Sequence, residues 1–180
     1  MFLNRIKFFL FVLFLACLIT TSCGKGGLSI TKKERNYEFG GVELGMSVTE
    51  LRSMNNLTEK KSITTLMNPE FRMFRFNDSN HNSVVVDNGV VKQINVYDFS
   101  EDQDVQKKKE ELIAKYGEPS FVSENEGRFV LGWGDVKLGD KGWSARGNFI
   151  TAEISTLLTQ VSIVMGDPDG WYDYSSAIMM

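Results

Sequence analysis

The sequence predicts an α+β fold in which two main helices pack on one face of an antiparallel sheet. Two observations support this prediction: helix-start signals at Ser47 and Ser100, and several strand-like segments that follow each of them. The order helix, strands, helix, strands suggests a degenerate tandem repeat of a helix-plus-strands unit. A chain of 180 residues suits one such domain, which we place at residues 37–167.

The first helix is predicted by a capping box. Ser47 is a good N-cap, and Glu50 follows three residues later. Met46 and Leu51 are spaced as a hydrophobic staple, which fixes the entry of the chain into the helix. We expect this helix to be short and to end by residues 55–56.

The second helix is predicted by another capping box, Ser100 with Gln103, and by the stop signals Gly117 and Pro119. Its apolar positions recur at near-helical spacing: Val105, Leu112, Ile113 and Tyr116. The charged run at residues 107–111 is expected to form the solvated face.

The remaining segments are predicted to be strands. Asp87-Asn88-Gly89 separates two β-branched runs, and Asn-Gly in this position is a strong hairpin signal. The expected strands are residues 71–76, 83–86, 90–96, 128–131, 135–138, 148–154 and 161–165. Residues 168–180 are expected to form a C-terminal tail.

Residues 1–22 are predicted to be an export signal peptide. Arg5 and Lys7 precede an uninterrupted apolar run, Phe8–Ile19. This run of 12 residues is too short to span a bilayer, which takes about 20 apolar residues. The leader carries two cations and no anion, so its removal lowers the net charge from −3 to −5.

Cys23 follows the small polar residues Thr20, Thr21 and Ser22. This arrangement resembles the lipobox of bacterial lipoproteins, and the resemblance implies that Cys23 receives diacylglycerol and becomes the N-terminus. Cys17 is the alternative lipidation site, and an unmodified thiol is the other alternative. Residues 23–36 are rich in Gly and charge and are expected to form a flexible tether.

The segments Gly45–Leu51 and Leu112–Pro119 resemble a family motif. Outer-membrane assembly lipoproteins of the SmpA/OmlA (BamE) type have a Gly-x-Ser/Thr helix start that closes on Gly-x-Pro. The related β-lactamase-inhibitor-protein-like domains have tandem helix-plus-sheet units. The resemblance implies a protein-binding or envelope-assembly scaffold without catalysis.

The sequence has few residues typical of catalytic or metal sites. His81 is the sole histidine and lies in a polar loop, where we expect it to be solvated. Segment 142–147 is one residue too long for a nucleophile elbow, and residues 167–170 favour a plain turn over a calcium loop. We therefore expect no enzyme activity, cofactor or metal, and the acidic balance gives no support to nucleic-acid binding.

Aromatic residues cluster toward the C-terminal half. Trp133 lies in an alternating strand and is expected in the core, whereas Trp171 and Tyr172 follow the last strand and are candidate ligand or partner contacts. The resulting hypothesis is a lipid-anchored protein of the bacterial cell envelope that binds an envelope protein. The outer membrane is the expected location, with the body facing the periplasm or the surface. The alternative is a lipoprotein that binds glycans through these late aromatic residues.

Overall fold

The computed structural model describes residues 36–61, 68–139 and 142–175, the last four of them by their backbone only. The chain divides between residues 34 and 35 into two units, and all described residues belong to the second unit. The expected signal peptide and nearly all of the expected tether lie outside the described residues.

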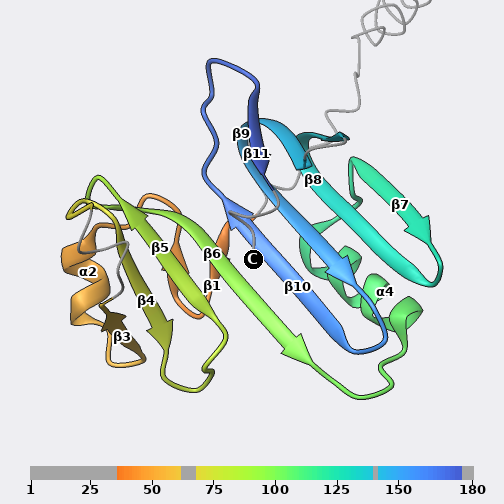
Figure 1. The fold of residues 1–180 in the computed structure, drawn as a ribbon, viewed down its shortest axis with the longest axis horizontal. Helices are drawn as coiled ribbons and strands as arrows, with labels where there is room; N and C mark the ends of the chain where they lie inside the picture. The colour runs from red at the N-terminus through yellow and green to blue at the C-terminus, as the bar shows by residue number, and fades with distance from the viewer. Residues whose placement is uncertain (1–35, 62–67, 140–141, 176–180) are drawn as a thin grey trace, which may run out of the picture. The chain divides into compact units, whose positions relative to one another are not determined.

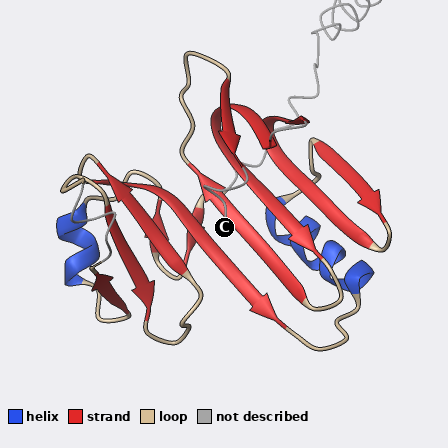
Figure 2. Ribbon diagram, in the orientation of Figure 1, coloured by secondary structure: helices blue, strands red, loops and turns tan. Residues whose placement is uncertain are grey.

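The described part of the chain has an α+β fold, as predicted, with two helices and an extensive antiparallel sheet (Figures 1 and 2). The helices are α2 (Val48–Ser53) and α4 (Val105–Tyr116). The strands are β1 (Glu38–Phe39), β2 (Val42–Glu43), β3 (Leu57–Lys60), β4 (Arg72–Phe76), β5 (Ser83–Asp87), β6 (Val90–Phe99), β7 (Phe121–Asn125), β8 (Arg128–Gly139), β9 (Gly142–Ile154), β10 (Leu158–Val164) and β11 (Tyr172–Ser175).

Strands β3 to β11 form one sheet in which every pairing is antiparallel. The strand order is β3-β4-β5-β6-β10-β9-β8-β7, and β11 pairs with β9. Strands β1 and β2 form a separate two-stranded ribbon. The pair β6–β10 therefore joins the strands that follow α2 to those that follow α4 (Figure 1).

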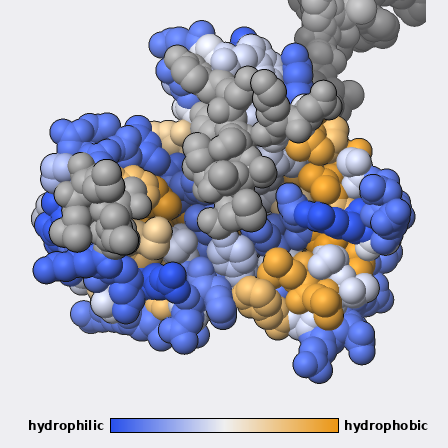
Figure 3. Space-filling view, in the orientation of Figure 1, coloured by the Kyte–Doolittle hydropathy of each residue, from blue (hydrophilic) through white to orange (hydrophobic). Residues whose placement is uncertain are grey.

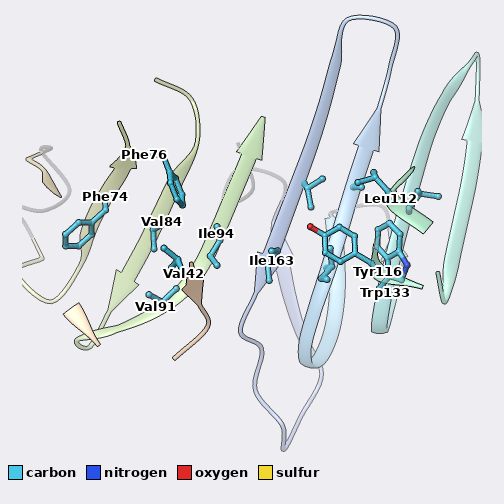
Figure 4. Close-up of a cluster of buried hydrophobic side chains, with 14 of the residues drawn as sticks. Val42, Phe74, Phe76, Val84, Val91, Ile94, Leu112, Tyr116, Trp133 and Ile163 are labelled. Carbon is cyan, nitrogen blue, oxygen red and sulfur yellow. The ribbon is translucent and has the colours of Figure 1, made fainter. Parts of the chain in front are cut away.

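The core is built on one continuous row of side chains across six strands (Figure 4). The pairing register places these residues side by side: Phe74, Val84, Ile94, Ile163, Ile150 and Trp133. All six are at most 1% exposed. Leu51 of α2 and Leu112 and Tyr116 of α4 belong to the same buried cluster.

Helix α2 begins as predicted. Glu50 N donates to Ser47 Oγ at 3.2 Å, and Ser47 N donates to Glu50 Oε2 at 2.7 Å, which completes the capping box. Met46 and Leu51 both pack into the main core cluster.

The predicted start of α4 is wrong. The N-cap is Asp104, whose Oδ1 accepts from Lys107 N at 3.0 Å. Ser100 N and Gln103 N instead donate to the carbonyls of Leu157 and Thr156 in the β9–β10 turn, at 3.3 and 3.0 Å. Tertiary hydrogen bonds therefore hold this segment in a loop, and the helix starts four residues later.

The other end of α4 is as predicted, because Gly117 ends the helix with a positive φ of 84°. The solvated-face prediction is wrong for two residues of the run 107–111. The ammonium of Lys108 lies 2.7 Å from Asp98 Oδ2, and that of Lys109 lies 4.2 Å from the centre of the Phe129 ring. Both lysines are half-buried because their long stems lie against the sheet.

The β5–β6 hairpin is confirmed, with positive φ at Asn88 (52°) and Gly89 (78°). The two strands predicted at 128–131 and 135–138 form one strand, β8, whose register shifts between Trp133 and Asp135. A Cβ on Gly134 would lie 2.9 Å from the Asn148 carbonyl oxygen, so the close approach at this irregularity requires glycine. Strand β9 likewise extends back to Gly142, six residues before its predicted start.

Residues of the β8–β9 hairpin and Val164 of β10 form a second, smaller core cluster. Its buried members are Val136, Trp143, Ala145, Phe149 and Val164. Strand β11, which falls in the range expected to form a tail, pairs with β9 beside this cluster. Among the described residues, neither helix has the length and apolar character required to cross a membrane.

Candidate functional site

The candidate site is a groove of about 380 Å³ between α4, β1 and the central strands β6 and β10. We call it the α4 groove. Five residues of the central strands line it. Four of them form two cross-strand pairs, Val96 with Val161 and Asp98 with Thr159, and the fifth is Tyr97. In Figures 1 and 2, α4 lies behind the sheet, so the groove opens on the face away from the viewer.

Helical periodicity explains which side chains α4 contributes. Lys108, Glu111, Leu112, Lys115 and Tyr116 all line the groove. They occupy positions i, i+3, i+4, i+7 and i+8, which share one face of a helix. Leu112 and Tyr116 are buried at 8% and 5% exposure, and the three charged residues form the rim.

An ion-pair cluster occupies one side of this rim. Lys108 Nζ lies 2.7 Å from Asp98 Oδ2 and 3.5 Å from Glu111 Oε2. The hydrogen bond to Asp98 raises the pKa of Lys108 above its ordinary value, and the two carboxylates add to this effect against the cost of partial burial. Lys108 therefore holds a strand carboxylate and a helix carboxylate together.

Lys115 connects α4 to β1. Its ammonium lies 5.0 Å from the centre of the Tyr116 ring and 5.5 Å from that of the Phe39 ring. Both distances are within the range of cation–π attraction. Phe39 itself packs edge-on against Phe76 at 5.3 Å, which anchors the β1 side of the groove to the core.

Two uncharged polar side chains of the groove take part in internal hydrogen bonds. Thr159 Oγ1 donates to Gln103 Oε1 at 3.1 Å, and Asn82 Oδ1 accepts from Tyr97 N at 2.7 Å. The arrangement is thus an apolar floor with a rim of both charges, which suits an amphipathic ligand. Within the described residues, no group of three or more His, Cys, Asp or Glu side chains could hold a metal ion.

The residues singled out by sequence do not line the groove. Trp171 is 43% exposed, and Lys137 Nζ lies 4.2 Å from the centre of its ring. Tyr172 is in β11, opposite Ala145. Cys23 and the alternative Cys17 lie outside the described residues.

Other sequence predictions agree with the structure. Trp133 is fully buried, as predicted, and its Nε1 donates to the Gly117 carbonyl at 2.7 Å. His81 is exposed in its loop, as expected, and its ring lies 4.6 Å from that of Phe99. At the turn near the C-terminus, Asp167 Oδ1 accepts from Asp169 N at 2.7 Å.

Sequence reasoning missed the groove because its residues come from four elements that are separate in the sequence, β1, β6, α4 and β10. Phe39 sits in a two-residue strand that gives no periodic signal. The helical positions did carry a signal: the series 108, 111, 112, 115 and 116 has ideal spacing, but three of its members are charged. The apolar pattern alone therefore placed the interior face of α4 slightly off its true position.

Comparison of the chain with protein-family models, with curated proteins and with solved structures found no match. The resemblance to BamE-type lipoproteins and to inhibitor-protein-like domains therefore stays a prediction. The function is argued below from the residues of this chain.

Proposed function

We propose that the protein is a membrane-anchored lipoprotein of the bacterial cell envelope whose body binds a segment of another protein in the α4 groove. The observation that carries the proposal is the groove itself, with Val96, Val161 and Leu112 at its apolar surface and charges of both signs at its rim. Amphipathic segments dock in this kind of groove, because apolar side chains enter it while flanking charges pair at the edge.

A protein segment suits the groove better than a small polar molecule does. Small-molecule sites combine apolar walls with a few polar groups that fix the ligand. Here the polar side chains of Thr159 and Asn82 already take part in internal hydrogen bonds. Binding energy would therefore come from apolar burial and from ion pairs with rim residues such as Glu111 and Lys115.

The anchor is proposed from the sequence. Cys23 follows an export leader, and two acyl chains on it would hold the protein stably where one chain is marginal. The proposed mature chain has a net charge of −5, so anionic lipid would not attract it. A covalent anchor supplies the attachment that charge does not.

We also propose that the fold is a degenerate tandem repeat, with both helices on one face of the sheet. Four strands follow α2 and five follow α4, and the order of the sheet without β11 is symmetric about the β6–β10 pair. Leu51 and Leu112 enter the same buried cluster, which supports a shared face.

Glycan binding is the second proposal, and the exposure of Trp171 favours it. Exposed aromatic rings can stack on sugars. Lys137 lies over one face of this ring, so a sugar would have to take the other face or displace the lysine.

Site-specific photo-crosslinking in intact bacteria tests the groove. A benzoylphenylalanine residue at position 111 or 115 is expected to form an adduct with one protein, through the same peptide of that partner. Position 110 is the matched control, since Glu110 is exposed on the same helix and does not line the groove. Equal adducts from position 110, or none from positions 111 and 115, would contradict the proposal.

A further inference from the structure

Two large exposed apolar residues lie near each other in the strand pairing at one end of the sheet. Phe99 is 57% exposed and Leu157 is 63% exposed, and they are the most exposed large hydrophobic residues of the described chain. Phe99 pairs with Leu158 at the ends of β6 and β10, which brings it beside the β9–β10 turn. Figure 3 shows hydrophobic residues gathered at this end of the sheet.

Aromatic rings extend this patch along β6. The His81 ring lies 4.6 Å from the Phe99 ring, and the Tyr97 ring is stacked on Phe99 at 6.3 Å. Tyr97 and Phe99 share one face of the strand by alternation, and Asp98 between them belongs to the other face. Tyr97 also lines the α4 groove, so the patch borders the groove at this residue, whereas neither Phe99 nor Leu157 lines it.

Hydrogen bonds hold the patch in place. Ser100 N donates to the Leu157 carbonyl at 3.3 Å, and Gln103 N donates to the Thr156 carbonyl at 3.0 Å. Ser155 Oγ accepts from the backbone N–H groups of Leu157 and Leu158, at 3.4 and 3.2 Å. Phe99 at the end of β6 and Leu157 in the β9–β10 turn therefore lie on segments that are hydrogen-bonded to each other, and a preorganised surface loses little entropy on binding.

The border of this patch is acidic. Glu101 and Asp102 are exposed and follow Phe99 directly after Ser100, in the loop that pairs with the β9–β10 turn. Asp102 has a positive φ of 56°, an uncommon conformation outside glycine that the tertiary hydrogen bonds maintain. Carboxylates at this border would repel an anionic bilayer, and they would repel each other if two copies met at this patch.

We infer that the Phe99–Leu157 patch is a second docking surface, for a partner-protein segment that carries an apolar side chain flanked by Lys or Arg. The apolar side chain packs against Phe99 and Leu157, and the flanking cations pair with Glu101 and Asp102. Phe99, Leu157 and the two carboxylates do not line the α4 groove, so this inference does not depend on binding in the groove.

The test measures peptide binding to the full chain in phosphatidylcholine nanodiscs by fluorescence anisotropy. The probe is a labelled Lys-Phe-Lys-Leu-Lys peptide, compared with Glu-Phe-Glu-Leu-Glu and Lys-Ser-Lys-Ser-Lys. The first peptide is expected to bind best. The double variants F99S/L157S and E101K/D102K are each expected to weaken it by about tenfold or more, as for central interface residues.

The control V122S removes an exposed apolar residue on β7 and is expected to leave binding unchanged. Equal binding of the acidic peptide, or no loss in either double variant, would overturn the inference. Phe99-dependent self-association of the chain, or Phe99-dependent binding to phosphatidylglycerol vesicles without peptide binding, would also overturn it by assigning the patch to another occupant.

Discussion

Ile94 of β6 and Ile163 of β10 face each other across the central antiparallel pair, and neither has any exposed surface. They are the middle of the six-residue row that crosses the sheet, with Val84 beside the first and Ile150 beside the second. The strands that follow α2 and those that follow α4 therefore meet at this pair. Its packing couples the two halves of the core.

Shortening either isoleucine should destabilise the whole domain. Truncation of a buried aliphatic side chain to Ala costs about 2–5 kcal/mol, because it removes buried area and leaves a cavity. We expect losses of this size for I94A and I163A in the free energy of unfolding measured with urea. I94V should cost about 0.5–1.5 kcal/mol.

The double variant I94A/I163A reports on the contact between the two residues. Because they are in contact, the two losses should not be additive. Additive losses, or two separate unfolding transitions in the wild type, would contradict a core shared by both halves.

Helix α4 should depend on Asp104 and not on Ser100. Replacement of an N-cap residue by Ala costs about 0.5–2 kcal/mol, so D104A should lower the free energy of unfolding by about this amount. S100A should change it by about 0.5 kcal/mol or less, because the Ser100 backbone N–H still bonds to Leu157. A larger loss of stability in S100A than in D104A would contradict this assignment and favour Ser100 as the N-cap.

Stability should fall at acidic pH, partly through Glu59. Burial raises the pKa of this carboxyl, but hydrogen bonds from Arg52 and Arg72 outweigh burial and leave the pKa below 4.5. A pKa lowered by folding stabilises the protein above the unfolded value, and this stabilisation is lost as pH falls through the folded value. The wild type should therefore lose stability below about pH 4.5.

The variant E59Q removes the titrating group. Its free energy of unfolding should be lower than that of the wild type at pH 7 and should fall less steeply below pH 4.5, the unfolded value of Glu59. E124Q, which removes an exposed carboxylate on β7, serves as the control for the change in net charge. If the stability of E59Q fell below pH 4.5 as steeply as that of the wild type, the ion pairs of Glu59 with Arg52 and Arg72 would not contribute to stability.

Tryptophan fluorescence separates protein binding from glycan binding. Of the three tryptophans, Trp133 and Trp143 are buried, and Trp171 is the exposed one. A sugar stacked on Trp171 would change its emission, whereas a segment bound in the α4 groove would leave it unchanged. We expect oligosaccharides to cause no change; saturable quenching that W171L abolishes would favour the glycan proposal.

Local sequence signals predicted the parts of the fold that local interactions decide. The α2 capping box, the Asn88-Gly89 hairpin and the Gly117 stop depend on neighbouring residues, and all three are correct. Ser100 failed because tertiary bonds to the β9–β10 turn replace the local cap. The length of β8 was missed because Gly134 indicates a break in the sequence but allows an irregularity within a continuous strand.

The candidate site was harder to predict than the fold. Residues of β1, β6, α4 and β10 line the α4 groove, and no local sequence pattern predicts that these elements lie next to one another. The sequence does contain an apolar pair at the exposed patch, Leu157-Leu158, between the strands predicted at residues 148–154 and 161–165. Its significance depends on the neighbouring Phe99, which only the pairing of β6 with β10 reveals.

The proposed attachment to the membrane is tested most directly by an intact-mass spectrum of the mature protein from bacteria that process lipoproteins. The account predicts a chain that begins at Cys23 and carries diacylglycerol on its thiol, with C23A unprocessed or released and C17A unaffected. A chain that begins at another residue, or one that begins at Cys23 with a free thiol and washes off the membrane, would contradict the account.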